Sequence, residues 1–253
     1  MKLIDAHMHF PMHLSSPFDA FVHQVKEASL SRFVLILNTK EEKLLFDKYR
    51  NKLDALCIPY SLVFLIKPGN NSDIQDFVKL NEYGITSNIK LHPRISDIRS
   101  EHFDLTAKTI EKCPADVVVV DCFAYGHKTQ NHIGIELAVY LADKFPEKKF
   151  ILAHAGGVDI LKTSLFTGLL KGNTFFDLSF TCNYFVGSSV QLDIAHFLKH
   201  NSNRTMFGSD YPAFTSNDAL TITMEFITQV HLNQEQQDAV LYSNARKIYW
   251  NEV

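Results

Sequence analysis

Several features that mark particular classes of protein are scarce in this sequence. It has only four cysteines, and none of them forms a CxxC pair. They are Cys57, Cys113, Cys122 and Cys182. Thiols spaced this widely favour reduced cysteines in a cytosolic protein over a disulfide framework or a zinc knuckle. The 8 prolines and 10 glycines are not gathered into a linker, so we expect a single domain over residues 1–253.

Long hydrophobic runs and an excess of charge are also missing. No stretch approaches the roughly 18 uninterrupted apolar residues of a membrane span. Polar residues, Asp5, His7 and His9, interrupt the first apolar run at once, which argues against a signal peptide. The 25 basic and 28 acidic residues nearly cancel, which disfavours nucleic acid or a membrane as a partner. We expect a cytoplasmic protein that acts on a small molecule, and the sequence also permits a homo-oligomer.

Short β-rich runs alternate with longer helical patterns along the whole sequence. The eight expected strands are Leu3–Ala6, Phe33–Leu37, Tyr60–Ile66, Ser87–Leu91, Asp116–Val120, Phe150–Ala153, Thr174–Leu178 and Arg204–Phe207. The expected helices include Phe18–Ser29, Glu41–Leu53, Ser72–Tyr83, Ile133–Lys144, Val190–Lys199 and Asn217–Val230. The β-branched run Val117–Val120 is typical of a parallel strand that is covered on both faces. Repeated β–α units predict parallel strands joined by right-handed crossovers.

The placement of polar residues favours a closed barrel over an open doubly wound sheet. Histidine, lysine and acidic residues follow the C-terminal end of run after run, which is where barrel enzymes carry their active sites. An open sheet would instead gather its site at one switch point. We therefore predict the α/β class and a (β/α)8 TIM-like barrel. Residues 233–253 are expected to add a C-terminal helical hairpin that closes the bottom or the side.

The first expected strand carries His7 and His9, two residues apart and in phase with Asp5. Chance supplies roughly 0.6 His-x-His pairs in a chain of this composition, so the pattern alone is weak. In a barrel, however, the last strand lies beside the first and brings Asp210 next to both histidines. Two imidazoles and a carboxylate are typical metal ligands. The alternatives are two surface histidines and a turn aspartate near Pro212.

Other strand ends offer residues that could bind or activate a substrate. His154 ends the sixth expected strand, and we expect it to polarise the substrate or assist proton transfer, with metal ligation as the second choice. Lys90 and His92 lie two apart on the fourth strand and share one face. Arg94 follows them and is placed to hold a substrate carboxylate or phosphate, although a solvated loop charge is an equal alternative.

The end of the fifth strand is the least certain part of the expected site. Asp121 follows the valine run and could ligate a metal, pair with Lys90 or cap the loop. His127, six residues further on, could fold back over the mouth of the barrel. Asp177 and Ser179, in phase on the seventh strand, are expected to hydrogen-bond residues at the rim.

Six stretches carry a family resemblance. They are IDAHMHF (4–10), IKLHPR (89–94), FILAHAGG (150–157), FFDLSF (175–180), MFGSDYP (206–212) and SNARKIY (243–249). In this order they resemble the amidohydrolase superfamily, in particular the amidohydrolase-related branch that includes aminocarboxymuconate-semialdehyde decarboxylase. The resemblance implies a distorted barrel with one divalent ion, usually zinc. It places His7, His9 and Asp210 on the metal and makes His154 the second catalytic group.

The sequence departs from the family after the fifth strand. The family usually has a metal-binding histidine there, whereas this chain has Asp121 followed by Cys122. Asp121 could replace the histidine as an oxygen ligand, Cys122 or His127 could serve instead, or the site could bind metal weakly or not at all. A set of two histidines and two aspartates would favour manganese over zinc.

Three functions follow from these residues. The leading hypothesis is a metal-dependent hydrolase of a small polar or anionic ester, lactone or amide, in which Asp210 moves protons and His154 stabilises the developing oxyanion. Lys90, His92 and Arg94 would bind the substrate. The second hypothesis is a metal-dependent non-oxidative decarboxylase. The third is an inactive barrel that serves as a binding protein, which the missing histidine would explain.

Overall fold

The computed structural model describes residues 2–82, 87–126, 129–168 and 172–252. Its strands form one parallel sheet of eight, in the order in which they occur along the chain. They are β1 (Ile4–Met8), β2 (Arg32–Leu37), β3 (Tyr60–Leu65), β4 (Ser87–Leu91), β5 (Val117–Asp121), β6 (Lys149–Ala153), β7 (Thr174–Asp177) and β8 (Thr205–Met206). Every predicted strand is present, with small shifts at the ends. His127, and Tyr83 at the end of the third expected helix, lie outside the described residues.

The last strand returns to the first and closes the barrel. Ala6 N–H donates to the Phe207 carbonyl at 3.0 Å, just beyond the end of β8. Above it, Asp210 N–H donates to the His7 carbonyl at 2.9 Å, and His9 N–H donates to the Tyr211 carbonyl at 2.7 Å. The predicted (β/α)8 barrel is therefore confirmed, and its closure brings Asp210 beside the two histidines.

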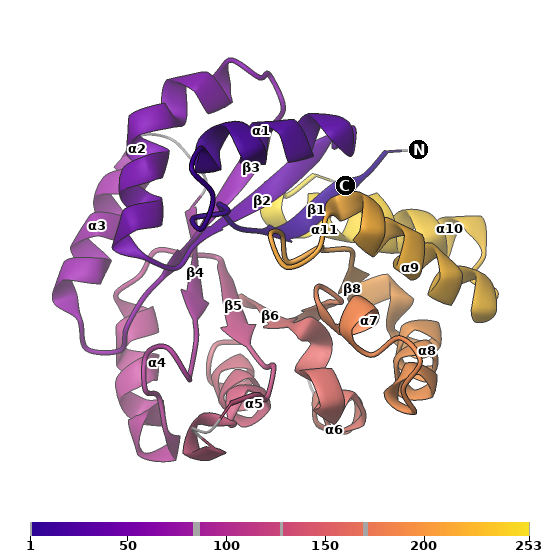
Figure 1. Cartoon of the computed structure of the whole chain (residues 1–253). Coiled ribbons are helices and arrows are strands. Elements are labelled where there is room, and N and C mark those ends of the chain that lie inside the picture. Colours follow the sequence, from indigo (N-terminus) through magenta and orange to yellow (C-terminus); the bar gives the residue numbers. More distant parts are fainter. Residues whose placement is uncertain (1, 83–86, 127–128, 169–171, 253) are drawn as a thin grey trace.

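Helices follow the strands and form a ring around the sheet (Figure 1). They are α1 (Pro17–Glu27), α2 (Lys40–Asp54), α3 (Asn71–Glu82), α4 (Phe103–Glu111), α5 (Gly134–Lys144), α6 (Ile160–Thr167), α7 (Thr181–Tyr184), α8 (Val190–Asn201) and α9 (Ser216–Gln229). Short 3-10 turns occur at Ser100–His102, Thr129–Asn131, His154–Asp159 and Ser202–Arg204. Within the described ranges, the helices are all too short or too polar to cross a membrane.

The C-terminal tail is one continuous helical segment and not the predicted hairpin. α10 (Gln234–Asp238) runs through a π-helical turn (Ala239–Ser243) into α11 (Asn244–Trp250). The segment contains neither glycine nor proline, so nothing in it favours a reversal of the chain. Ile248 and Tyr249 of α11 pack with side chains of the barrel interior, so the tail closes one end of the barrel as expected.

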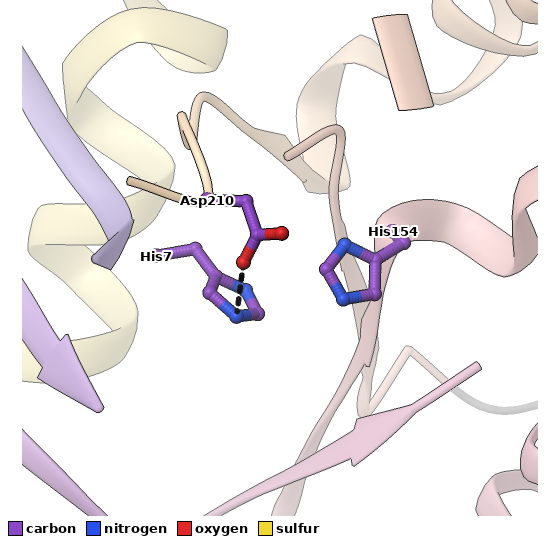
Figure 2. Close-up of side chains that lie close together, drawn as sticks. All are labelled: His7, His154 and Asp210. Carbon is purple, nitrogen blue, oxygen red and sulfur yellow. Dashed lines mark ion pairs between the residues drawn. The ribbon is translucent and has the colours of Figure 1, made fainter. Parts of the chain in front are cut away.

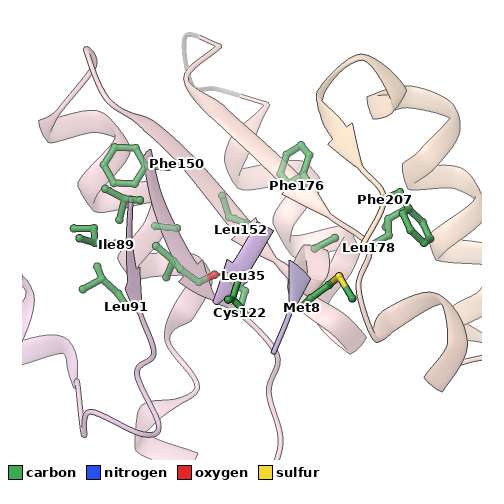
Figure 3. Packing of buried hydrophobic residues seen from close by; sticks show 14 of the residues in the cluster. Met8, Leu35, Ile89, Leu91, Cys122, Phe150, Leu152, Phe176, Leu178 and Phe207 are labelled. Carbon is green, nitrogen blue, oxygen red and sulfur yellow. Dashed lines mark hydrogen bonds between the residues drawn. The ribbon is translucent and has the colours of Figure 1, made fainter. Parts of the chain in front are cut away.

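The strands are covered on both faces by apolar side chains. The valine run of β5 shows this arrangement directly, because Val117 and Val119 pack inside the barrel while Val118 and Val120 pack outward against the helical layer. Figure 3 shows part of that outer layer, where Ile89 of β4 lies among the other outward-facing strand residues. Full burial of such a side chain contributes roughly 1.5–3 kcal/mol, so the two layers hold the strand ends in fixed positions.

Candidate functional site

The carboxyl ends of the strands open into a pocket of about 560 Å³ at the mouth of the barrel. Most residues that the sequence predicted for the site line this pocket. They are His9, Lys90, His92, Arg94, Asp121, His154 and Asp210. The remaining predicted residue, His7, is fully buried and contacts several of them. The barrel therefore brings together residues from both ends and the middle of the sequence.

An irregularity in β1 turns its two histidines toward the pocket. Ile4 and Ala6 pack inside the barrel, whereas Met8 packs with the outer layer. The register between β1 and β2 shifts within this segment. A shift of this kind reverses the alternation of faces along a strand. As a result, His7 and His9 both face the mouth of the barrel.

Asp5 lies behind His7 and not in phase with it, contrary to the prediction. Its Oδ1 accepts hydrogen bonds from the backbone N–H groups of His7 at 3.2 Å and Ser209 at 3.0 Å. Its Oδ2 accepts from Ser216 Oγ of α9 at 2.7 Å. Burial raises the pKa of Asp5 to about 6, although the bonds from Ser209 and Ser216 oppose this shift. Asp5 thus ties β1 to the loop that carries Asp210.

His7 is held through one ring nitrogen and presents the other to the site. Its Nδ1 lies 3.1 Å from Asp177 Oδ2 and 3.2 Å from Ser179 Oγ. Its Nε2 lies 3.2 Å from Lys90 Nζ and 3.4 Å from Asp210 Oδ1. Burial, and next the charge of Lys90, lower the pKa of His7 to about 4. The ring is therefore neutral, and Nε2 carries a lone pair.

His9 is oriented in the same way by different partners. Its Nδ1 donates to the Ile36 carbonyl at 3.0 Å and lies 3.7 Å from Glu42 Oε1. Its Nε2 lies 3.7 Å from Asp210 Oδ1. Glu42 was not among the residues predicted for the site, although the sequence carries a signal for its position. Thr39 and Glu42 have the spacing of a helix capping box, and this box fixes the buried carboxylate at the start of α2.

Asp210 is the meeting point of the two histidines. One of its oxygens is paired with His7, and the other is directed toward His154 (Figure 2). Its φ angle of 61° lies in the left-handed region, which is unusual for a residue other than glycine. Residues with strained backbone angles of this kind are frequent at functional sites, where the surrounding structure must stabilise them. The bond from its N–H to the His7 carbonyl provides part of that support.

Asp121 faces a group of nitrogen atoms on β4 and β6. Its Oδ2 lies 3.3 Å from His154 Nε2, 3.5 Å from His92 Nε2 and 3.7 Å from Lys90 Nζ. Burial acts to raise the pKa of this carboxyl, but the surrounding groups, His92 first, hold it well below its usual range. The pairing with Lys90, one of the three roles that the sequence left open for Asp121, is present. Lys90 and His92 share one face as expected.

His154 has an acceptor at each ring nitrogen. Its Nδ1 lies 3.0 Å from the Ser179 carbonyl oxygen, and its Nε2 faces Asp121. Burial opposes the charged form, but the hydrogen bond and charge of Asp121 prevail and raise the pKa of His154 to about 9. The imidazolium form therefore suits this position. The turn that follows needs glycine, because a Cβ at Gly157 would lie 2.7 Å from the Phe123 ring.

Asp177 and Ser179 link the two buried histidines, as the prediction of rim hydrogen bonds anticipated. Asp177 Oδ1 accepts from the backbone N–H groups of His154 and Ser179, each at 3.1 Å, and also from the Ser179 hydroxyl. Its other oxygen binds His7. Burial acts to raise the pKa of Asp177, but the contacts with His7 lower it below its usual range. One buried carboxylate therefore positions both histidines.

The donor atoms fit a divalent cation. The Nδ1 atoms of His7 and His9 are held by carboxylate and carbonyl acceptors, which is typical of metal-binding histidines. Each Nε2 faces Asp210, and that of His7 also lies 3.2 Å from Lys90 Nζ. A second grouping also exists, because ligand atoms of His7, His154 and Asp210 all lie within 4.8 Å of one another. The acceptors at both nitrogens of His154 favour the first grouping.

The aromatic residues near the pocket separate into two groups. Phe123, Phe180 and Tyr184 line the pocket, and Phe180 lies with its ring centre 5.0 Å from that of Phe123. Phe10 instead belongs to the buried core and packs on Phe21. The pocket therefore has one apolar wall beside its cationic and acidic residues.

Comparison with known proteins gives a family and a fold. The family model described as amidohydrolase matches residues 15–250, which begins after the two histidines of β1. A search of curated proteins gave no match. An uncharacterised TIM-barrel protein from Bordetella bronchiseptica has a TM-score of 0.73 at 12% identity, with 98% of each chain covered.

Two further solved structures are similar over nearly all of this chain. One is a probable 2-pyrone-4,6-dicarboxylic acid hydrolase from Acinetobacter baumannii, with a TM-score of 0.68, 14% identity, and 99% of this chain and 100% of the other covered. The other is a D-hydantoinase from a Bacillus species, with a TM-score of 0.65, 14% identity, and 97% and 70% covered. At these identities the likeness shows the barrel fold alone. The family match shows that the chain belongs to the amidohydrolase family.

Proposed function

We propose that the protein is a metal-dependent hydrolase of a small polar or anionic ester, lactone or amide. His7, His9 and Asp210 would hold one divalent ion, zinc or manganese. The observation that carries this proposal is that the Nε2 atoms of His7 and His9 both face Asp210 Oδ1, at 3.4 Å and 3.7 Å respectively. Membership of the amidohydrolase family supports it, as does the barrel shared with a probable pyrone dicarboxylate hydrolase.

Asp121 was expected as a further metal ligand, and its contacts favour a different role. Its Oδ2 faces nitrogen atoms of His154, His92 and Lys90, so these side chains already surround the carboxylate oxygen that would bind an ion. We propose that Asp121 keeps His154 protonated and balances Lys90. The expectation that Asp121 ligates the ion stays a prediction, and metal content in an Asp121 variant decides between the two roles.

The protein's own groups can carry out the proton transfers of hydrolysis. When bound, a divalent ion supplies Lewis acidity that makes water a nucleophile near neutral pH. Asp210 keeps one oxygen on the side of His154, where it can accept a proton from the attacking water and return it to the leaving group (Figure 2). Asp121 holds His154 in its charged form, and that positive charge can stabilise the developing oxyanion.

The substrate would be held by the cationic side of the pocket. Lys90 faces Asp121, which balances its charge, and burial lowers the pKa of His92 to about 4, so His92 is neutral. Arg94 lines the pocket and is the better candidate for an anionic group of the substrate. Lys90 and His92 would then act on the substrate indirectly, because they hold Asp121 in position.

A substrate panel tests this proposal. We expect the purified protein to release acid from small carboxylated esters, lactones or amides, and the His154→Asn variant to lose this activity while it keeps its metal. Release of carbon dioxide without bond hydrolysis would overturn the hydrolase and support the decarboxylase. Absence of both turnover and metal would support the binding protein.

A further inference from the structure

Arg94 rests on an aromatic ring and has no acidic partner among the described residues. Its guanidinium carbon lies 3.3 Å from the centre of the Tyr125 ring, and its Nε is buried with no hydrogen-bond partner in the described part of the chain. Because the face of the guanidinium contacts the ring, its N–H groups point outward in the plane of the group. The charge is thus held in position and not neutralised.

The loop after β5 is built around this contact. The Tyr125 carbonyl accepts a hydrogen bond from His132 Nε2 at 3.0 Å, which anchors the loop at the stacked residue. Gly126 has a φ of 85°, and a Cβ there would lie 3.7 Å from Arg94 Nη1, so the chain turns closely past the guanidinium. Tyr125 is itself half exposed, with 50% of its surface accessible.

The stacked pair is also joined to the catalytic side of the pocket. Tyr125 packs edge-to-face on Phe123 with ring centres 5.7 Å apart, and Phe123 packs on His154 at 5.8 Å. Arg94, Tyr125, Phe123 and His154 all line the same pocket. A group bound by Arg94 would therefore lie in the cavity that His154 and Asp210 share.

We propose that Tyr125 is a positioning residue that sets the plane of Arg94 for two-point recognition of a substrate carboxylate. This inference rests on the proposed function, because it names how that site selects its substrate. A carboxylate presents two oxygens that match the edge of a guanidinium, whereas an acidic residue in place of Tyr125 would already occupy that edge. The aromatic ring contacts the face of the group and, because Nε is buried, leaves the edge between the two Nη nitrogens available.

Binding of benzoate, with benzamide as its neutral analogue, tests the proposal. Calorimetric titration would be made on the full-length protein, as purified and after EDTA treatment, so that binding by a metal ion is separated from binding by Arg94. We expect benzoate to bind more tightly than benzamide. The Tyr125→Ala and Tyr125→Leu variants should weaken benzoate binding about three- to five-fold. Arg94→Lys should weaken it about tenfold, because lysine keeps the charge but lacks the two parallel N–H groups of a guanidinium.

The matched control is Tyr125→Phe, which keeps the ring and should bind benzoate as the wild type does. Benzamide binding should be the same in all variants, a result that general loosening of the loop would not give. Wild-type affinity for benzoate in both Tyr125→Ala and Tyr125→Leu would overturn the proposal, as would equal binding of benzoate and benzamide by the wild type. Metal content measured on the same preparations reports separately on the proposed function.

Discussion

Asp210 Oδ1 lies 3.4 Å from His7 Nε2, although one residue follows the last strand and the other belongs to the first. The contact depends on closure of the barrel, because Asp210 N–H also donates to the His7 carbonyl. Backbone pairing therefore fixes the distance between the two side chains. A site built in this way is positioned by the fold itself and does not depend on a flexible loop.

Replacement of Asp121 separates its two candidate roles. In Asp121→Asn we expect the metal content to stay at the wild-type level and hydrolysis to fall by about 10²-fold or more, because His154 loses the charge that keeps it protonated. Metal analysis and a rate assay on one preparation give both values. The control is Asp116→Asn, an exposed carboxylate in the residue just before the same strand. Loss of metal in Asp121→Asn alone would show that Asp121 is a ligand.

Asp177 should matter for metal affinity although it does not face the ion. Asp177→Asn removes the negative charge from His7 Nδ1, and loss of such a partner typically weakens metal binding about 10–100-fold. Competition with a chelating dye measures the affinity directly. Asp104→Asn makes the same chemical change on an exposed helix residue and should bind as the wild type does. Equal affinities in the two variants would contradict the positioning role of Asp177.

The cysteines should differ sharply in reactivity. Burial raises the pKa of Cys113 to about 11 and that of Cys182 to about 12, and the pKa of buried Cys122 also lies well above its usual value. Since the thiolate is the reactive form, only about one in a thousand Cys113 side chains is ionised at pH 8. Exposed Cys57 should therefore be the one thiol that reacts rapidly with Ellman's reagent in the native protein.

Unfolding and substitution check the assignment of that thiol. Denatured protein should release four equivalents of the chromophore, and native Cys57→Ser should show no rapid phase. Raising the pH toward 10 should speed the slow phase, because ionisation of the buried thiols increases. Two or more rapid thiols in the native wild type at pH 8 would contradict the burial described here.

Much of the fold could be predicted because its signals are local. β-Branched runs such as Val117–Val120 and the repeated helical spacings mark each β–α unit separately, and polar residues after the strands indicate which end carries the site. The pairing of His7 and His9 with Asp210 followed from closure alone. Pairing with Lys90 was one of three roles that the sequence left open for Asp121, beside metal ligation and capping of the loop.

Other features depend on contacts that local patterns do not show. The register shift in β1, which moves Asp5 out of phase with His7, arises from pairing with β2. The position of Glu42 beside His9 follows from the packing of α2, although its capping box is visible in the sequence. The role of Asp121 depends on which of several neighbouring nitrogen atoms its carboxylate faces, and only the folded structure supplies that arrangement.

The metal content of the purified protein shows whether His7, His9 and Asp210 hold an ion. Protein purified after expression in metal-supplemented medium and dialysed against metal-free buffer would be analysed by inductively coupled plasma mass spectrometry. We expect about one zinc or manganese ion per chain in the wild type and none in the folded His7→Ala/His9→Ala double variant. A wild-type protein that is fully folded and metal-free, or a double variant that keeps its ion, would contradict this expectation.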